Sequence, residues 1–536
     1  MNFEIKRVEN GIPKYNITDN INAAKTISTN KLWSGSGFGY SLSGSGVTLG
    51  EWDGGLVLTS HQEFGGRVTA PDAAALSTHS THVAGTMVAA GVSANAHGMS
   101  HQANLIEHDW TNDDTEMATE ASIGLKVSNH SYGLITGWNY NYYNDSKWVW
   151  FGDSAISEVE DYSFGFYNTE AETWDGIAVA YPNYLICKSA GNDRDEGPSG
   201  AVNHWFFKNG IKTASTKLRN RDGNGGFDCI ASSGVAKNLL TVGAINDITS
   251  GYANPSGVVM SSFSCWGPTD DGRIKPDIVA NGVSLFSTIE SATNAYGSLS
   301  GTSMATPSAS GSLGLILQYQ TMLHGATPLR SSTVKALIIN TADEAGAATG
   351  PDYTFGWGLM NTLKAVQLMT SDSADGFGTH IRETSLSNGQ TKEFEVSCDG
   401  TSPLKATICW TDPAATPVGA SLDPTNIMLV NDLDVRIVRK RDNTVYQPWI
   451  LNPASPSTAV PTRSPRRGSR RTSSSATSTP CPSGRSRSAR SPRCRRGSGP
   501  RRGSPPPRCA AGSGAREGRS RGRRPAVASG ECRIRR

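Results

Sequence analysis

The chain has 536 residues, which is room for two or three domains, and 37% of them are hydrophobic. It contains no run of 18 apolar residues, so the sequence predicts no membrane-spanning helix. The formal net charge of +3 conceals an asymmetry, because residues 454–536 hold 22 of the 50 basic residues and only two of the 47 acidic ones. The first 453 residues are therefore acidic, which argues against nucleic-acid binding by that part of the chain.

Residues 1–45 form a predicted N-terminal arm. Two stretches rich in glycine and serine, at 34–37 and 43–46, mark it as a connecting segment. The first residues contain no apolar run, so we expect no signal peptide in this chain. The second Gly/Ser stretch leads directly into the first predicted strand of the next domain.

A buried strand is predicted up to Asp53, because Val47 and Leu49 are apolar and Gly54-Gly55 ends the run. A carboxylate at the end of a strand is held rigidly enough to orient an imidazole and to stabilise it once protonated. The alternative is an ordinary turn aspartate before two glycines.

His79 precedes a run of small apolar residues, 83–91, that predicts a helix buried in the protein interior. His79 would lie on the first turn of that helix and face a cleft. His82 is three residues further on, so the two imidazoles could share a helix face as metal ligands. No third ligand follows at a metalloprotease spacing, which favours a structural role for His82.

Asn192 follows another predicted strand, formed by Tyr184 to Cys187. Its side-chain N–H could donate a hydrogen bond to a developing oxyanion, although a Gly-Asn pair is by itself more often a turn. The stretch between Gly133 and Ser189 is rich in aromatic residues. It forms either a wall of a substrate groove or, the interpretation we favour, a satellite cluster packed onto the sheet.

Ser303 lies in the run Gly301-Thr302-Ser303-Met304-Ala305-Thr306-Pro307. The small residues let a helix begin at the serine and let a substrate carbonyl approach it closely. The hydroxyl and the first helical N–H groups would then point to one place, as a nucleophile with an oxyanion hole requires. The competing interpretation is a plain helix N-cap.

Strands alternate with helices through this region, which predicts an α/β fold with a mainly parallel sheet flanked by helices. The order Asp53, His79, Asn192, Ser303 resembles that of subtilisin-like serine peptidases, the subtilases, over about residues 46–370. The chain departs from the usual family pattern at Gly54, Ser80 and Ser308, none of which is a catalytic residue.

The resemblance implies a set of residues that would hold the substrate. Two stretches would frame the pocket for the residue before the cut, namely Ser131, Tyr132 and Gly133, and Ser189, Ala190 and Gly191. It also implies a secreted or cell-surface enzyme that acts on proteins or peptides, needs no cofactor for its chemistry and can bind structural Ca²⁺. The acidic loops 193–196 and 269–272 are candidates for Ca²⁺, or are simply solvated, and the metal ligands stay unassigned.

A second domain is predicted over residues 378–453. Strands are expected at 391–396, 404–410, 433–439 and 445–451, from the alternation of apolar and polar residues. This pattern resembles the β-sandwich, or jelly-roll, domain that follows the catalytic domain in some subtilases. The predicted strands are too few to close a sandwich, so the domain is expected to be incomplete.

Residues 454–536 contain no lysine and no aromatic residue, and Arg, Ser, Pro and Gly dominate. Such a segment cannot bury a core and is predicted to be disordered. It is either an Arg-rich tail that binds polyanions or, the interpretation we favour, an out-of-frame translation of GC-rich DNA.

The sequence thus predicts a monomeric serine endopeptidase with an Asp53–His79–Ser303 triad and Asn192 in the oxyanion hole. The alternatives are a catalytically silent binding protein on the same fold, or a polyanion-binding protein that acts through its tail.

Overall fold

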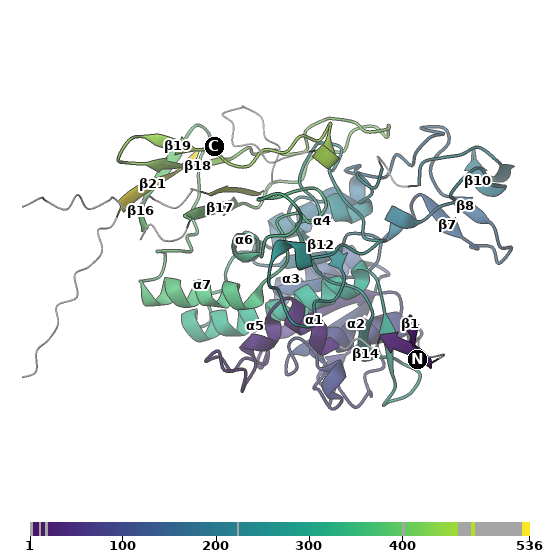
Figure 1. Ribbon diagram of the computed structural model, residues 1–536, viewed down its shortest axis with the longest axis horizontal. Helices are drawn as coiled ribbons and strands as arrows, with labels where there is room; N and C mark the ends of the chain where they lie inside the picture. The colour runs from purple at the N-terminus through teal and green to yellow at the C-terminus, as the bar shows by residue number, and fades with distance from the viewer. Residues whose placement is uncertain are drawn as a thin grey trace, which may run out of the picture.

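The computed structural model describes residues 4–9, 12–16, 20–221, 225–398, 403–458, 473–477 and 528–535. At its centre is a seven-stranded sheet in the order β13-β12-β9-β6-β3-β5-β4, in which every neighbouring pair is parallel (Figure 1). Its strands are β3 (Thr48–Asp53), β4 (Val68–Thr69), β5 (Asn104–Asp109), β6 (Val127–His130), β9 (Leu185–Ser189), β12 (Leu240–Ile245) and β13 (Ile278–Asn281). The predicted α/β class is confirmed.

Helices cover both faces of this sheet, as a parallel sheet with buried strands requires. One face packs against α1 (Asn20–Thr26), α2 (Thr78–Val88), α5 (Thr302–His324), α6 (Ser331–Thr341) and α7 (Thr362–Ala374), in the main hydrophobic core. The other face packs against α3 (Asp113–Ile123) and α4 (Thr169–Ala180) in a second core around Trp52 and Trp174. None of the helices in the described part of the chain is long and apolar enough to cross a membrane.

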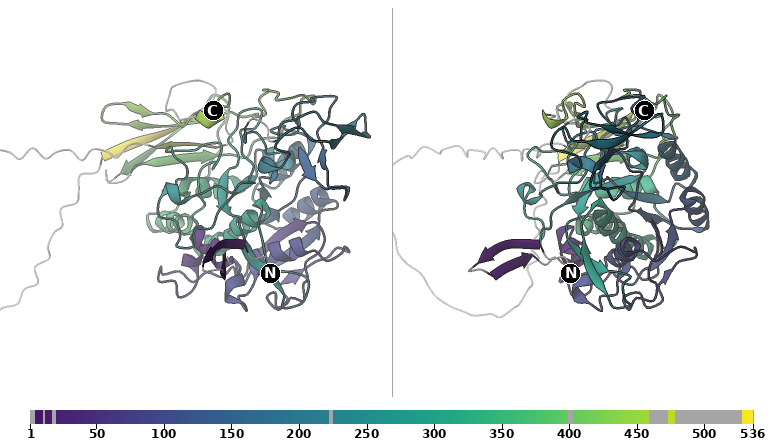
Figure 2. Two further views of the ribbon diagram at one scale, coloured as in Figure 1. Left: turned by 45° about the vertical axis from the view of Figure 1, so that its right-hand side comes forward. Right: turned by 90° about the vertical axis from the view of Figure 1, so that its right-hand side faces the viewer.

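The N-terminal residues divide into two parts. A hairpin of β1 (Glu4–Glu9) and β2 (Ile12–Asn16) projects from the body, as Figure 2 shows. From residue 20 onward the chain enters the main core, where Ala23, Ile27 and Leu32 are fully buried. Packing therefore makes residues 20–45 part of the central body, whereas the sequence suggested an arm over the whole of 1–45.

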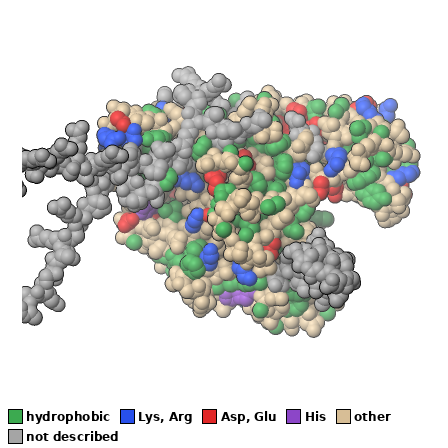
Figure 3. Space-filling view, in the orientation of Figure 1, with side chains coloured by type: hydrophobic (Ala, Val, Ile, Leu, Met, Phe, Trp, Pro, Cys, Tyr) green, Lys and Arg blue, Asp and Glu red, His purple; other side chains and the backbone are tan. Residues whose placement is uncertain are grey.

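Two strands of the aromatic-rich stretch, β7 and β8, join β10 and β11, which follow Ser189, in a separate four-stranded sheet in the order β11-β10-β8-β7, which projects at the upper right of the view (Figures 1 and 3). Its strands are β7 (Trp138–Tyr140), β8 (Trp148–Trp150), β10 (His204–Lys208) and β11 (Ile211–Ser215). Trp138, Trp150 and Phe206 make a small core of their own. The favoured satellite cluster agrees with this separate core, but the sheet projects from the body and Tyr140 is 55% exposed at its edge.

The C-terminal part is rich in β-structure. Its strands are β16 (Thr391–Cys398), β17 (Lys405–Cys409), β18 (Asp434–Arg439), β19 (Thr444–Tyr446), β20 (Ser473–Thr477) and β21 (Ala528–Arg535). The first four lie close to the predicted strands, and they form sheets β16-β21-β18-β19 and β17-β20. A jelly-roll domain stays a prediction. Within 454–536 the structure has two strands where disorder was expected, and residues 459–472 and 478–527 lie outside the described part.

Short elements complete the fold. A hairpin of β14 (Leu285–Thr288) and β15 (Tyr296–Leu299) packs beside α2. The 3₁₀ turns are η1 (Thr29–Leu32), η2 (Ala94–Ala96), η3 (Asp193–Asp195), η4 (Ser232–Val235), η5 (Pro255–Gly257) and η6 (Pro456–Thr458). Basic and acidic side chains are interspersed on the face shown in Figure 3, so its described residues form no continuous basic surface there.

A buried ion pair docks the segment between β17 and β18 onto the central body. Lys237 Nζ lies 2.7 Å from Asp412 Oδ2, and both side chains are completely buried. Lys237 also donates to the backbone carbonyls of Pro413 and Met428. Asp412 accepts hydrogen bonds from the backbone N–H groups of Val430 and Asn431. The segment that follows the central body in sequence is therefore anchored in its interior.

Candidate active site

The predicted site residues gather at one edge of the central sheet. Asp53 is the last residue of β3, Ser131 directly follows β6, and Asn192 comes three residues after β9. Because all strands are parallel, their carboxyl ends meet at the same edge. After β3 the chain forms β4 and β5 on one side of β3 and then crosses to form β6 on the other side. Such a switch point is where open α/β sheets bind ligands.

Asp53 and His79 are in direct contact. His79 Nδ1 lies 2.8 Å from Asp53 Oδ1 and 2.9 Å from Oδ2, and Asp53 is 2% exposed. The backbone N–H of Gly54 donates to Asp53 Oδ1 at 2.7 Å and fixes the carboxylate. Burial lowers the pKa of His79, but the charge of Asp53 and the hydrogen bond to it outweigh that effect and raise the pKa above its ordinary value.

His79 is positioned by the first turn of α2. The hydroxyl of Ser77 caps this helix by accepting from the backbone N–H of Ser80 at 3.2 Å. Ser80, which stands where subtilases usually have glycine, donates from its hydroxyl to the carbonyl of Gly55 at 2.8 Å. The departure from the family pattern thus ties the helix to the loop after Asp53.

His82 is not part of this contact. Its Nε2 lies 2.9 Å from the backbone carbonyl of Leu285, and burial lowers its pKa to about 4. The two histidines therefore use their side chains separately, His79 toward Asp53 and His82 toward β14. This arrangement favours the structural interpretation of His82 over a shared metal.

Ser303 is the second residue of α5 and is 9% exposed. Its hydroxyl donates to the carbonyl of Ser131 at 2.9 Å, and the hydroxyl of Ser131 donates to the carbonyl of Ser303 at 3.0 Å. Pro307 stands four residues after Ser303 and has no N–H, so it cannot supply the usual helical hydrogen bond to that carbonyl. Ser131 fills this place. Among the described residues no hydrogen bond joins the Ser303 hydroxyl to His79.

Asn192 is oriented by Thr302. Its Oδ1 accepts from the backbone N–H of Thr302 at 2.8 Å and from the Thr302 hydroxyl at 2.9 Å. The amide nitrogen Nδ2 is consequently turned the other way and has no hydrogen-bond partner among the described residues. A Cβ built on Gly301 would lie 3.5 Å from Asn192 Nδ2 and 3.5 Å from the Ser303 backbone nitrogen. Two N–H donors thus border the same space beside Gly301.

The two predicted substrate-binding stretches lie next to each other, because they follow the paired strands β6 and β9. Lys188, in β9, joins them: its Nζ donates to the carbonyl of Tyr132 and to Ser189 Oγ at 3.2 Å. Burial lowers the pKa of Lys188 to about 8. The Tyr132 hydroxyl donates to Asp113 of α3 at 2.6 Å. Lys188 was missed by the sequence analysis, although a lysine within an otherwise apolar strand was a visible signal.

Two groups of side chains among the described residues have the spacing of metal ligands, namely Asp72, His108 and Glu116, and Glu160, Asp228 and Asp423. Neither contains a residue of the predicted loop 193–196. In the other predicted loop, Asp271 forms a buried ion pair with Arg273 at 2.9 Å.

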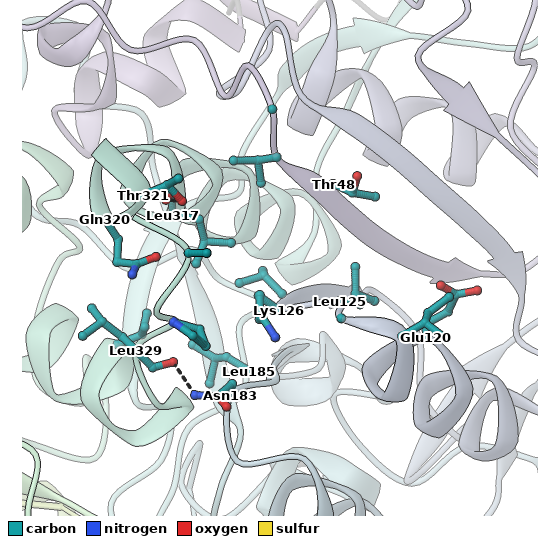
Figure 4. Close-up of a pocket in the computed structure, with 18 of the residues that line it drawn as sticks. Thr48, Glu120, Leu125, Lys126, Asn183, Leu185, Leu317, Gln320, Thr321 and Leu329 are labelled. Carbon is teal, nitrogen blue, oxygen red and sulfur yellow. Dashed lines mark hydrogen bonds between the residues drawn. The ribbon is translucent and has the colours of Figure 1, made fainter. Parts of the chain in front are cut away.

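A pocket of about 370 Å³ opens at the opposite end of the sheet, lined in part by Thr48, Leu185 and Gln320 (Figure 4). Thr48 and Leu185 are the first residues of β3 and β9, whereas Asp53 and Asn192 lie at or beyond the ends of these strands. The Asn183 side chain donates to the carbonyl of Leu329 there at 2.9 Å. The pocket is therefore separate from the Asp53–His79 site.

Comparison with known proteins gives a family match over more than half of the chain. The model of the Subtilase family matches residues 59–358. The C5a peptidase of Streptococcus pyogenes is 44% identical over 116 residues, which are 20% of this chain and 10% of that protein. The serine protease/ABC transporter B family protein tagB of Dictyostelium discoideum is 29% identical over 254 residues, 35% of this chain and 13% of that protein.

Solved structures with a similar fold include the CspB protease of Clostridium perfringens, at 16% identity and a TM-score of 0.45, which covers 65% of this chain and 98% of that one. The prenylagaramide maturation protease PagA is 20% identical, with a TM-score of 0.40, and covers 60% of this chain and 92% of that one. The chain spans about a tenth of the length of the curated relatives it matches.

Proposed function

The chain belongs to the subtilase family of serine-type endopeptidases, and we propose that it cleaves peptide bonds in proteins through an acyl-enzyme formed on Ser303. The observation that carries this proposal is the contact of His79 Nδ1 with both oxygens of Asp53. That contact fixes the imidazole so that Nε2 is left for the serine hydroxyl.

In the proposed reaction His79 takes the proton from the Ser303 hydroxyl while its oxygen attacks the scissile carbonyl carbon. Asp53 stabilises the imidazolium that results. His79 then gives the proton to the leaving amine as the C–N bond breaks. Water, activated by His79, attacks the acyl-enzyme, and the peptide acid leaves as the proton returns to Ser303.

The negative charge that develops on the carbonyl oxygen would be held beside Gly301. Asn192 Nδ2 and the Ser303 N–H border that space, and the N-terminus of the 23-residue helix α5 adds its partial positive charge. The contacts of Thr302 with Asn192 Oδ1 support this role, because they turn the amide N–H₂ group away from Thr302.

The Ser303 hydroxyl must leave the carbonyl of Ser131 before it can meet His79. The reason is that the single hydroxyl proton can serve only one acceptor at a time. In this proposal the side chain of Ser303 rotates about its Cα–Cβ bond to turn the hydroxyl from Ser131 toward His79. In this proposal residues 131–133 and 189–191 receive the substrate segment before the cut, with Lys188 joining the two walls. Secretion or cell-surface location is proposed from family membership alone.

The test is labelling by a fluorophosphonate probe, with casein hydrolysis measured in parallel. We expect the full chain to be labelled and active, and Ser303→Ala to lose both properties. The matched control is Ser308→Ala, which removes a buried hydroxyl from the same helix. Within the described part of the chain that hydroxyl donates to the Met304 carbonyl alone. Labelling that persists in Ser303→Ala, or a folded wild-type chain that is never labelled, would contradict the proposal and favour the catalytically silent binding protein.

A further inference from the structure

Four carboxylates from four separate loops meet beside Gly165. They belong to Glu160, which follows β8, Asp228, which precedes η4, Asp270, which precedes β13, and Asp423, between β17 and β18. Ligand oxygens of Glu160, Asp228 and Asp423 all lie within 4.8 Å of one another. A Cβ at Gly165 would lie 2.2 Å from Asp228 Oδ1 and 2.3 Å from Asp270 Oδ1, so the fourth carboxylate borders the same cradle.

The backbone holds three of these loops in place. Gly165 donates its N–H to the carbonyl of Ile230 at 2.9 Å and accepts from the N–H of Asp270 at 3.1 Å. The N–H of Asp228 donates to the carbonyl of Gly267 at 3.1 Å. The positions of Asp228 and Asp270 are therefore set by the fold, and Gly165, with φ of 70°, leaves the space between them open.

Three carboxylate oxygens at the centre of the group have no hydrogen-bond partner among the described residues. Asp228 is 9% exposed, and its buried Oδ1 accepts no hydrogen bond from the described part of the chain. The same holds for both buried oxygens of Asp270. Glu160 Oε2 accepts from the Asn220 side chain at 3.0 Å. A buried carboxylate that accepts no hydrogen bond is costly, and two side by side need a specific explanation.

Three of these carboxylates also have no compensating cation in the described part of the chain. No described Lys or Arg forms an ion pair with Asp228, Asp270 or Asp423, and the nearby Arg273 is paired with Asp271. Asp228 and Asp270 therefore lie in the interior with neither a cation among the described residues nor a described hydrogen-bond donor at Asp228 Oδ1 or at the two oxygens of Asp270.

We propose that Glu160, Asp228, Asp270 and Asp423 bind one Ca²⁺ ion. All four donors are hard carboxylate oxygens, which suit Ca²⁺ rather than zinc or copper. The ligands come from four irregular loops, and Ca²⁺ accepts an irregular arrangement of oxygens. Mg²⁺ requires a nearly regular octahedron. A divalent ion would also offset the mutual repulsion that nothing else in the described surroundings offsets.

The ion would link two parts of the molecule. Three ligands belong to the central body, whereas Asp423 lies in the segment that Lys237 and Asp412 anchor. Close by, the N–H of Met428 donates to Asp271 Oδ2 at 3.2 Å. Bound Ca²⁺ would therefore fasten the segment between β17 and β18 at a second point, and its removal would loosen that segment first.

The test uses the full chain with Ser303→Ala to prevent autolysis, stripped with EDTA and dialysed at neutral pH. Isothermal titration calorimetry should then detect one Ca²⁺ per chain, and Ca²⁺ should raise Tm. The double variant Asp228→Asn/Asp270→Asn should lose both effects, and Asp423→Asn, at an exposed position, should weaken binding by roughly tenfold or more. Asparagine adopts the positive φ of 63° at Asp228 readily, so folding should be preserved.

Thermal unfolding without Ca²⁺ is the second measurement. It distinguishes an ion-binding site from carboxyl groups that are buried in their protonated form. Without Ca²⁺ the double variant should unfold at the same or a higher temperature than its parent, because the neutral amides remove the repulsion. Glu116→Gln, from the other acidic group, is the matched control and should bind Ca²⁺ normally. Absence of Ca²⁺ binding by the parent, unchanged binding in the double variant, loss of binding in Glu116→Gln, or equal stabilisation by Mg²⁺ would each overturn the assignment.

Discussion

Ser303 and Ser131 exchange hydrogen bonds, each hydroxyl donating to the backbone carbonyl of the other, over 2.9 and 3.0 Å. The exchange links the N-terminus of α5 to the end of β6, across 172 residues of sequence. It also supplies the donor that Pro307 cannot give to the Ser303 carbonyl. The residue that we propose as nucleophile is thus held by its main chain, while its hydroxyl stays able to rotate.

Ser131→Ala should destabilise the protein by about 1–3 kcal/mol, because it leaves the buried Ser303 carbonyl without a donor. The second change Pro307→Ala restores a helical N–H to that carbonyl, so the double variant should recover part of the loss. Equilibrium unfolding of the four proteins of this cycle, in the Ser303→Ala background, measures the coupling. Strictly additive effects of the two substitutions would show that Ser131 and Pro307 do not share this carbonyl.

Asp53→Asn should shift the acidic limb of the pH profile of kcat/KM to lower pH. The carboxylate favours the imidazolium and so raises the pKa of His79. The base is therefore protonated, and activity lost, as the pH falls through this raised value. Without the charge the pKa falls and the limb moves with it, while kcat drops by about 10⁴-fold, as the same change does in trypsin-like peptidases. An unmoved acidic limb would assign that ionisation to another group.

Asn192→Ala should lower kcat by about 10²–10³-fold and leave KM nearly unchanged, the range found when the corresponding donor is removed from subtilisin. The reason is that the amide would bond the oxyanion and not the ground-state carbonyl. Asn183→Ala is the matched control, because its amide serves the Leu329 carbonyl at the opposite end of the sheet. Steady-state kinetics on a chromogenic peptide separate the two parameters, and a change confined to KM would argue for a substrate-binding role instead.

Asp412→Ala should destabilise the protein by about 3–5 kcal/mol, because it leaves the Lys237 ammonium buried without its counter-charge. The segment after β17 should become sensitive to limited proteolysis at the same time, since Asp412 also accepts from Val430 and Asn431. Glu158→Ala breaks the exposed pair between Glu158 and Lys217 and should cost far less stability, because solvent screens an exposed ion pair. Equal losses in the two variants would mean that burial of the Lys237–Asp412 pair is unimportant.

Much of the central body could be predicted from the sequence, because the information is local. The run from Tyr184 to Cys187 is apolar throughout, as is typical of a strand buried on both faces. Asp53 and Asn192 each stand at or just after the end of a predicted strand. Their position at the carboxyl edge of a parallel sheet therefore follows from the sequence alone. The spacing of the small residues around Ser303 similarly predicted the start of α5. The roles of these residues in catalysis stay predictions.

The contacts that decide the fine behaviour of the site could not be predicted, because each joins distant segments. Nothing near Ser303 shows that its hydroxyl meets the Ser131 carbonyl, since that depends on a rotamer and on how α5 sits against β6. The group of four carboxylates proposed to bind Ca²⁺ could not be predicted for the same reason. Asp270 belongs to a loop that the sequence singled out, but its neighbours Glu160, Asp228 and Asp423 come from three other loops and share no spacing.

The Lys237–Asp412 pair bears on how the chain is made. Lys237 is synthesised 175 residues before Asp412, and Ser303 also leaves the ribosome well before that carboxylate does. Until residues 412–428 emerge, the nascent chain has neither the carboxylate of Asp412 nor the carbonyls of Pro413 and Met428 that enclose the Lys237 ammonium group, so the region around that group stays open. The last step of folding is therefore expected to wait for the segment after β17, so that the proposed nucleophile is assembled only late in translation.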